Sequence, residues 1–376
     1  MKTMSRYSCL RKELRPHGGI SQKCVSSCFL FDDCSGIEPR RSLFKEDCFD
    51  INCCRDGSCD NVCPYKGDFV DRWREVGGLR FDDISPIEQK PVPLPRYVPV
   101  IHHGYSRSEP LDCPVVALST YHVLRLDKSG VYRPIAETAE SLRAAFRLNP
   151  ATRIILRGTA KDPPLELYWK HRRRDGVPQL LANLGASLII GPNYSHFLDV
   201  PRTDNLFNRK RQLICLAEMV AAALSPVPHI SAVMPGDWTF WLHFLRTNPT
   251  IRQVAVEFQT GNKRGAEGTK AVQRLARLRD DLGRALHPIV IGGAQFLTRI
   301  ASEFEEFTLM DSAPFMKGIK RRSFDDSKAG RAWVEQRTSP GEDIGDLIRQ
   351  NILRYSAWVD RRCDSVSTRK EQTAVG

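Results

Sequence analysis

The sequence lacks any apolar run long enough to cross a membrane. No stretch approaches the roughly 18 consecutive apolar residues that a membrane-spanning helix needs. The N-terminal stretch MKTMSRYSCLRKELRPHGG carries positive charge but lacks the apolar segment found in secretory signals. These two absences predict a cytoplasmic protein with no membrane partner.

The cysteines lack the common metal-binding spacings. Eight of the twelve lie within residues 24–63, yet no C-x2-C zinc pair and no C-x3-C-x2-C triplet of radical enzymes occurs there. This density without an export signal favours metal over disulfides in a reducing compartment. We expect a zinc ion or an iron–sulfur cluster, because the spacing ending at Cys63-Pro64 is similar to iron–sulfur ligation. The alternative is a compact lobe of reduced thiols. The predicted ligands are Cys24, Cys28, Cys34, Cys48, Cys53, Cys54, Cys59 and Cys63.

Acidic residues are too few to balance the basic ones. The chain of 376 residues has 56 Lys and Arg against 44 Asp and Glu, a formal net charge of +12. A basic surface favours a polyanionic partner, because neutralised phosphates release their counterions. The alternative is a basic protein without such a partner. The residues expected to contact nucleic acid are Lys317, Lys320, Arg321, Arg322 and Arg209.

No internal repeat is evident, but apolar runs and helical patterns alternate from residue 98 onward. The predicted strands cover residues 98–103, 114–121, 152–158, 186–193, 228–235, 253–259, 287–293 and 307–312. The predicted helices cover residues 135–148, 205–224, 238–246, 267–282 and 294–304. Continuous apolar strands are typical of parallel sheets covered by helices. Eight such units predict an α/β fold, a (β/α)8 TIM-like barrel, with an open doubly wound sheet as the alternative.

The predicted domains follow from composition. Four prolines in the run QKPVPLPRYVP mark an extended linker before the barrel. A polar, disordered tail is expected from Asp364. The predicted parts are an N-terminal tail (1–23), a cysteine-rich metal-binding lobe (24–66), a linker (67–97), the catalytic barrel (98–320), and a C-terminal helix with the tail (321–376).

Polar residues follow the predicted strands, at the end where barrel enzymes carry their active sites. In QVAVEFQ, Glu257 and Gln259 share the face opposite the bulky residues, so we expect them to point into the barrel mouth. A structural ion pair of Glu257 is the alternative.

Asp311 ends an apolar strand, where a buried carboxylate is costly unless it is paired or takes part in function. A helix cap or an ion pair with Lys317 is the alternative there.

Two glycines end the preceding strand, in IGGAQF. Gly292 and Gly293 would let a flat ligand lie against the backbone, whose N–H and C=O groups can read its edge. The alternative is a tight turn from strand to helix.

The order of these segments resembles the tRNA-guanine transglycosylase superfamily. VAVEFQTGN, HPIVIGGAQF and FTLMDSAP are similar to its ordered strand-end signatures, and PNYSHFLDVPRTDN is similar to its aspartate-bearing segment. The resemblance covers about residues 186–318 and extends to bacterial and phage relatives that act on DNA as deazaguanine DNA transglycosylases. The tRNA enzymes carry a C-x-C-x2-C zinc site after the barrel and a further RNA-binding domain. Neither pattern follows Asp311 here, which favours DNA over RNA.

The resemblance implies a role for each matching residue. Asp311 would be the nucleophile at the sugar C1′. Asp199 would contact the base and help proton transfer, with Asp204 as the competing choice. The remaining implied or candidate base contacts are Gln259, Gly292, Gly293 and Asn193.

The function favoured by the sequence is therefore cleavage or exchange of an N-glycosidic bond in nucleic acid, as in a DNA glycosylase or transglycosylase acting on a flipped-out base. The catalytic candidates are Asp311, Asp199 and Glu257. Two alternatives remain: a metal-dependent, iron–sulfur oxidoreductase on a barrel, and a DNA-binding protein without catalysis. The sequence leaves the oligomeric state open.

Overall fold

The computed structural model contains two compact units. The described residues are 69–105, 107–197, 202–259, 261–263, 265–325, 327, 332–339 and 341–374. Unit 1 comprises Met1–Pro86, Asn193–Ala217 and Ser231–Thr247, and unit 2 comprises Ile87–Pro192, Glu218–Ile230 and Asn248–Gly376. The predicted metal-binding lobe and Asp199 lie outside the described residues.

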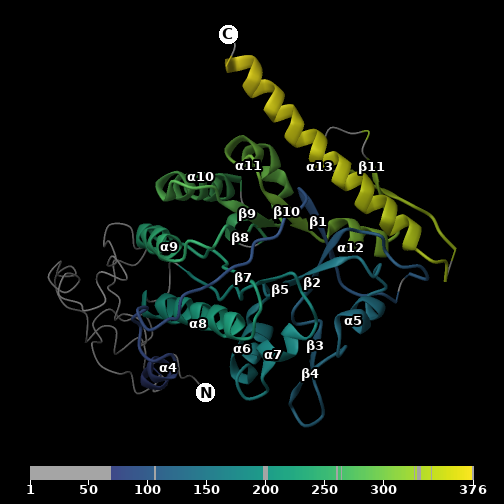
Figure 1. Ribbon diagram of the computed structural model, residues 1–376. Coiled ribbons are helices and arrows are strands. Elements are labelled where there is room, and N and C mark those ends of the chain that lie inside the picture. The colour runs from purple at the N-terminus through teal and green to yellow at the C-terminus, as the bar shows by residue number, and fades with distance from the viewer. Residues whose placement is uncertain are drawn as a thin grey trace, which may run out of the picture. The chain divides into compact units, whose positions relative to one another are not determined.

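Eight parallel strands of unit 2 form one sheet (Figure 1). They are β1 (Tyr97–Ile101), β2 (Val115–Ser119), β5 (Arg153–Arg157), β6 (Leu188–Ile190), β7 (Pro226–Val227), β8 (Gln253–Glu257), β9 (His287–Ile291) and β10 (Thr308–Asp311). Their order is β7-β6-β5-β2-β1-β10-β9-β8. The two ends of this order meet, because His229, just after β7, forms a parallel bridge with Ala255 of β8. The sheet is thus the predicted (β/α)8 TIM-like barrel.

Alternate residues of the strands fill the barrel interior. One continuous apolar cluster takes side chains from all eight strands, which only the inside of a closed sheet allows. On β8 the cluster contains Ala255 but neither neighbour, and on β10 it contains Met310 but not Leu309. This alternation shows which face of each strand points inward.

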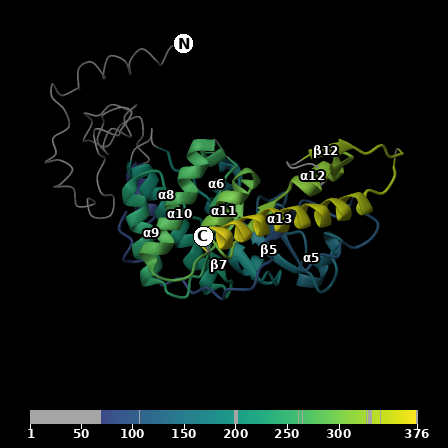
Figure 2. The ribbon, with the colours of Figure 1, turned by 90° about the horizontal axis from the view of Figure 1, so that it is seen from above.

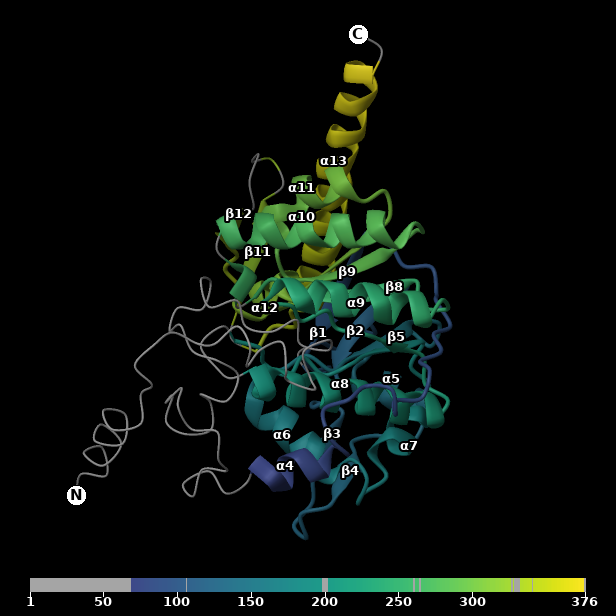
Figure 3. The same cartoon turned by 90° about the vertical axis from the view of Figure 1, so that its left-hand side faces the viewer.

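Helices follow most strands, as predicted. In unit 2 they are α5 (Ala139–Ala145), α6 (Asp162–His171), α7 (Val177–Ala182), α10 (Gly265–Leu282), α11 (Leu297–Glu303), α12 (Ala313–Ile319) and α13 (Gly345–Ala374). The helix α8 (Arg202–Ala221) follows β6, α9 (Pro235–Thr247) follows β7, and α4 (Phe69–Glu75) precedes the barrel in sequence. Short 3-10 turns are η1 (Gly261–Lys263) and η2 (Ala294–Phe296). Helices α10 and α11 lie side by side outside β8 and β9 (Figure 3). Within the described chain, no helix combines the length and apolar character needed to cross a membrane.

The amino end of the barrel is sealed by residues predicted to be a linker. The Gln89 amide nitrogen donates to the carbonyls of Pro226 (3.0 Å) and Gln253 (2.9 Å). Its oxygen accepts from the backbone N–H groups of Arg252 and Gln253. Val92 and Leu94 pack against the interior cluster. The segment after Ile87 is therefore part of the barrel, because its polar groups complete the hydrogen bonding of the strand starts.

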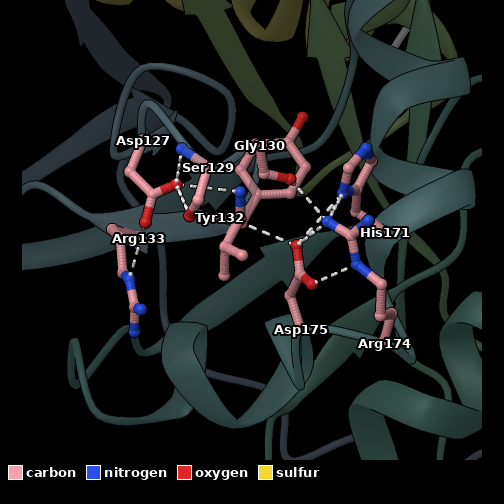
Figure 4. Close-up of polar contacts among 9 residues, drawn as sticks. Asp127, Ser129, Gly130, Tyr132, Arg133, His171, Arg174 and Asp175 are labelled. Atoms are coloured by element: carbon pink, nitrogen blue, oxygen red, sulfur yellow. Dashed lines mark hydrogen bonds and ion pairs between the residues drawn. The ribbon is translucent and has the colours of Figure 1, made fainter.

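A hairpin of β3 (Leu124–Leu126) and β4 (Tyr132–Pro134) follows β2 and is tied to the end of α6 (Figure 4). The Asp175 carboxylate accepts from the Tyr132 backbone N–H at 2.9 Å and lies 3.1 Å from Nδ1 of His171. Arg174 binds Asp175 and the Gly130 carbonyl. The pKa of Asp175 is held well below its usual range, first by the bond from Arg174. These contacts fix the hairpin on unit 2.

The last helix, α13, runs past α11 and α12 (Figure 2). It continues to Ala374, where the sequence predicted a disordered tail from Asp364. Asn351 anchors it, because this buried side chain accepts from the Phe324 N–H and donates to the Arg322 carbonyl. Both partners lie in β11 (Arg322–Asp325), which pairs with β12 (Ala332–Glu335). A single buried amide thus joins α13 to this hairpin.

Candidate functional site at the carboxyl end of the barrel

Two charged residues of opposite sign end strands on the inner face of the barrel. Arg157 ends β5 and Glu257 ends β8. Each stands two residues after a member of the interior cluster, Ile155 and Ala255 respectively. Both side chains therefore lie on the inward face at the carboxyl end, where barrel enzymes carry their catalytic groups. The strand-parity prediction for Glu257 agrees with this placement.

Local sequence fixes the position of Arg157. Gly158 follows it, and its N–H donates to the Ile190 carbonyl at 2.9 Å. A Cβ at this glycine would lie 2.3 Å from the Ile190 oxygen, so β5 and β6 approach this closely only with glycine here. The Tyr121 hydroxyl donates to the Gly158 carbonyl at 2.8 Å. Both contacts hold the strand end from which Arg157 projects.

The charges at the site act on each other. Burial lowers the pKa of the Arg157 guanidinium, whereas Glu257 and then Tyr121 act in the opposite direction. The guanidinium stays protonated at neutral pH, because its ordinary pKa is far above 7. Across the described chain, the buried Nε of Arg157 has no hydrogen-bond partner. A cation and a carboxylate therefore lie at the end of a barrel whose interior cluster is apolar.

Three histidines follow β1 and β2, and β2 is the neighbour of β5 in the sheet. The rings of His102 and His122 lie 5.5 Å apart, and His103 stacks on Tyr105 at 3.7 Å. The pKa of His102 is lowered to about 4, first by burial and then by the charges of His122 and Arg157. His102 is therefore neutral at pH 7. No described group bonds its buried Nε2.

His229 is buried where the barrel closes between β7 and β8. Burial lowers its pKa to about 4. It follows Val227 of the interior cluster by two residues, so it too stands on the inward face. The barrel end thus holds a second neutral imidazole.

Asp311 lies on the other side of its strand. Met310 belongs to the interior cluster, so Asp311 faces outward. Its carboxylate accepts from the Tyr355 hydroxyl of α13 at 2.8 Å and from the Ala313 N–H at 2.9 Å. The structure does not bring it together with Glu257. Its catalytic role stays a prediction. Asp311 bonds the first N–H group of α12, but Ser312 is the N-cap residue of that helix.

The paired glycines form a turn. Gly292 and Gly293 have φ of +70° and +75°, in the left-handed region that favours glycine. The Gln259 side chain lies over Gly292, and that of Phe258 lies over Gly293. Gln259 and Gly292 thus lie together, but side chains cover the backbone expected to read a base.

Four predicted nucleic-acid contacts lie on or after α12. Lys320 and Arg322 are exposed, whereas Lys317 and Arg321 are half-buried. Arg321 has a φ of +51°, which is uncommon for a residue with a side chain. Lys320 and Arg322 remain available to phosphate.

The fifth predicted contact, Arg209, is in unit 1 and is fully buried. Its guanidinium pairs with Asp237 at 2.5 Å and lies 4.6 Å from the Phe240 ring centroid. This corrects the expectation that Arg209 contacts nucleic acid, because a side chain so enclosed offers no surface to a phosphate.

Asn193 and Asp204, the other predicted base contacts, are half-buried residues of unit 1, and Asp204 lies in the first turn of α8. Nearby, Asn205 binds both the N–H and the carbonyl of Phe197. These two bonds hold the Phe197 backbone to α8.

Metal ligation remains a prediction of the cysteine spacing alone. Among the residues that the structure describes, no group of three His, Cys, Asp or Glu is arranged to hold a metal ion. Cys113, Cys215 and Cys363 are buried, and none of the three forms a disulfide within the described chain.

Sequence reasoning missed Arg157, His102 and His229. Each follows an apolar strand run, in TRIILRG, VPVIHH and PVPHI, so the polar end of the run was the available signal. Comparison with protein families and with curated proteins gives no match to this chain. The site must therefore be interpreted from its own chemistry.

Proposed function

We propose that this protein cleaves or exchanges an N-glycosidic bond in nucleic acid, preferentially DNA, and that Glu257 is its catalytic carboxylate. One observation carries the proposal: Glu257 and Arg157 share the inner face at the carboxyl end of the barrel, just beyond its apolar interior cluster. Charged groups are costly there unless they are paired or used.

The chemistry requires a carboxylate near the anomeric carbon. The C1′–N bond breaks through an oxocarbenium-like state, and a carboxylate stabilises or traps it. The bonding electrons leave with the base, which takes up a proton. Water then supplies hydroxide to C1′ and a proton to the medium, or an incoming base forms a new C1′–N bond and releases its own proton.

The class of substrate is inferred from the net charge of the protein and from the exposed basic residues after α12. The net charge of +12 favours a polyanion. A base inside a duplex must leave the stack before its glycosidic bond is reached, at a cost of a few kcal/mol. Exposed Lys320 and Arg322 are suited to contact the flanking phosphates.

The test is base release by the variant Glu257→Gln. The full-length protein is incubated with single- and double-stranded DNA that contains modified bases, and the released bases are measured by mass spectrometry. We expect the variant to remain folded and to lose about 10³-fold in rate, because the amide keeps the shape without the charge.

The matched control is Glu267→Gln on α10, an exposed carboxylate paired with Lys270. It should release bases at the wild-type rate. Wild-type rates in folded Glu257→Gln would remove Glu257 from the mechanism. DNA binding without base release by the wild-type protein would favour the non-catalytic alternative.

A further inference from the structure

We infer that Arg157, His102 and His122 form a binding site for a phosphate group of the nucleic-acid substrate, on the β1–β2–β5 side of the barrel end. This inference rests on the proposed function, because it assigns the phosphate of the target nucleotide to the groups beside Glu257. We call these three residues the phosphate subsite.

Neighbouring strands bring the subsite together. In the sheet, β1 pairs with β2 and β2 pairs with β5. Arg157 ends β5, and the two histidines follow the ends of β1 and β2. The carboxyl ends of adjacent parallel strands lie at one edge, so residues distant in sequence meet there.

Buried nitrogens of the subsite lack partners. Among the described residues, neither Nε of Arg157 nor Nε2 of His102 has a hydrogen-bond partner. Buried polar atoms in proteins are nearly always bonded to protein or to water, so two such nitrogens in one place indicate a ligand that supplies acceptors. Phosphate offers several acceptor oxygens, and its charge is suited to the arginine.

The charges of the subsite point to the same ligand. Arg157 and His122 both disfavour a proton on His102, after burial itself. Arg157 also disfavours one on His122, again after burial. An anion bound between them would reverse these effects, because it would interact favourably with every member. A neutral ligand would leave the pKa values of both histidines low.

The carboxylate of Glu257 sets the direction of the substrate. It acts on Arg157 from β8, which lies beyond β6 and β7 on the side of β5 away from the histidines. A phosphate close to Glu257 would be repelled, so we place the phosphate on the histidine side of Arg157. The sugar would then lie between the subsite and the catalytic carboxylate.

The test is calorimetric titration of the full-length protein with three probes: inorganic phosphate, a deoxynucleoside monophosphate and a short single-stranded oligodeoxynucleotide. The variants are Arg157→Gln and His102→Gln. Arg153→Gln is the matched control, because Arg153 begins the same strand and bonds the Pro93 carbonyl at the amino end. We expect each subsite variant to bind the monophosphate at least about tenfold more weakly. The control should bind as the wild type does.

A second measurement separates this inference from the proposed function. Glu257→Gln should bind the monophosphate as tightly as the wild type or more tightly, while it loses base release. Phosphate binding that depends on Arg157 without any base release would preserve the subsite and overturn the proposed reaction.

Equal affinities of wild type and both folded subsite variants would overturn the inference, as would equal binding of the monophosphate and its nucleoside. Failure of the oligodeoxynucleotide to compete with the monophosphate would assign the subsite to a free nucleotide and overturn the nucleic-acid assignment. If Arg157→Gln does not fold, the same titrations are made with His102→Gln and Arg157→Lys.

Discussion

The two ends of the barrel differ in how well their buried polar groups are hydrogen-bonded. At the amino end, Gln89 makes four hydrogen bonds to strand backbone, and Gln253 bonds both backbone groups of Val92. At the carboxyl end, nitrogens of His102 and Arg157 are buried without partners among the described residues.

This difference separates stability from function within one fold. Bonded polar groups at the amino end keep the barrel closed. Unbonded groups at the other end lower stability, since each buried unpaired polar group costs about 1–3 kcal/mol. Such a cost is expected where a ligand completes the bonding, which is the end where barrel enzymes act.

The largest expected effect on stability comes from the amino end. Gln89→Ala should lower the free energy of unfolding by about 2–4 kcal/mol, because it leaves several buried backbone groups without partners. Urea unfolding measures this, with the exposed neighbour substitution Glu88→Ala as control. Phosphate affinity of the folded variant should not change; a large change would contradict the separation of the two ends.

The stability of the protein should depend on pH through the buried histidines at the carboxyl end of the barrel. Folding lowers the pKa values of His102 and His229 to about 4 from their ordinary 6.5. The unfolded chain then binds more protons between these values, so the stability from these groups is full above pH 6.5 and is lost as pH falls toward 4. We expect a loss of about 1–3 kcal/mol between pH 7 and pH 5.

Urea midpoints across this range measure the effect. His229→Gln should flatten the pH profile, because it removes the more deeply buried of the two imidazoles. An equally steep profile in that variant would assign the pH dependence to other groups.

Asp311→Asn tests whether the outer face of β10 takes part in catalysis. We expect an unfolding free energy lower by about 1–2 kcal/mol, because the Tyr355 hydroxyl and the Ala313 N–H lose a shared carboxylate. Tyr355→Phe should cost a similar amount. Base release should survive in both. A folded Asp311→Asn protein that loses about 10³-fold in rate would return Asp311 to the mechanism.

The smallest expected effect concerns DNA affinity. Replacing exposed Lys320 and Arg322 by Glu should reduce the slope of log affinity against log salt by about 2, or about one unit for each lost phosphate contact. Lys90→Glu, at the amino end of the barrel, is the control and should leave the slope unchanged. Equal slopes in both proteins would place the DNA on another surface.

The positions of the strands could be predicted because strands of a barrel are buried and therefore appear in the sequence as apolar runs. The predicted segment 253–259 contains the observed Gln253–Glu257. The fifth strand was placed at 228–235 but lies at Pro226–Val227, since only two residues pair before the chain turns away. The helix α6 was not predicted. It begins with two prolines, which are favoured in the first turn of a helix.

The site was less predictable than the fold. The direction of the Glu257 side chain could be predicted because bulky and small residues alternate along its strand. The strands before Arg157 and Asp311 are apolar on both faces, so their sequences do not reveal which side chains point inward. The pairing of Asp311 with Tyr355 depends on a helix that begins more than 30 residues later.

The pairing of β1 with β10 has a consequence for folding while the chain is being made on the ribosome. Tyr97 and Asp311, which meet across it, stand 214 positions apart. At about 5–20 residues per second, the ribosome needs about 10–40 s to make the second strand after the first. Until then β1 keeps one open edge, and such edges pair readily with other chains. The edge of β1 that pairs with β10 therefore stays open to other chains until residue 308 has emerged.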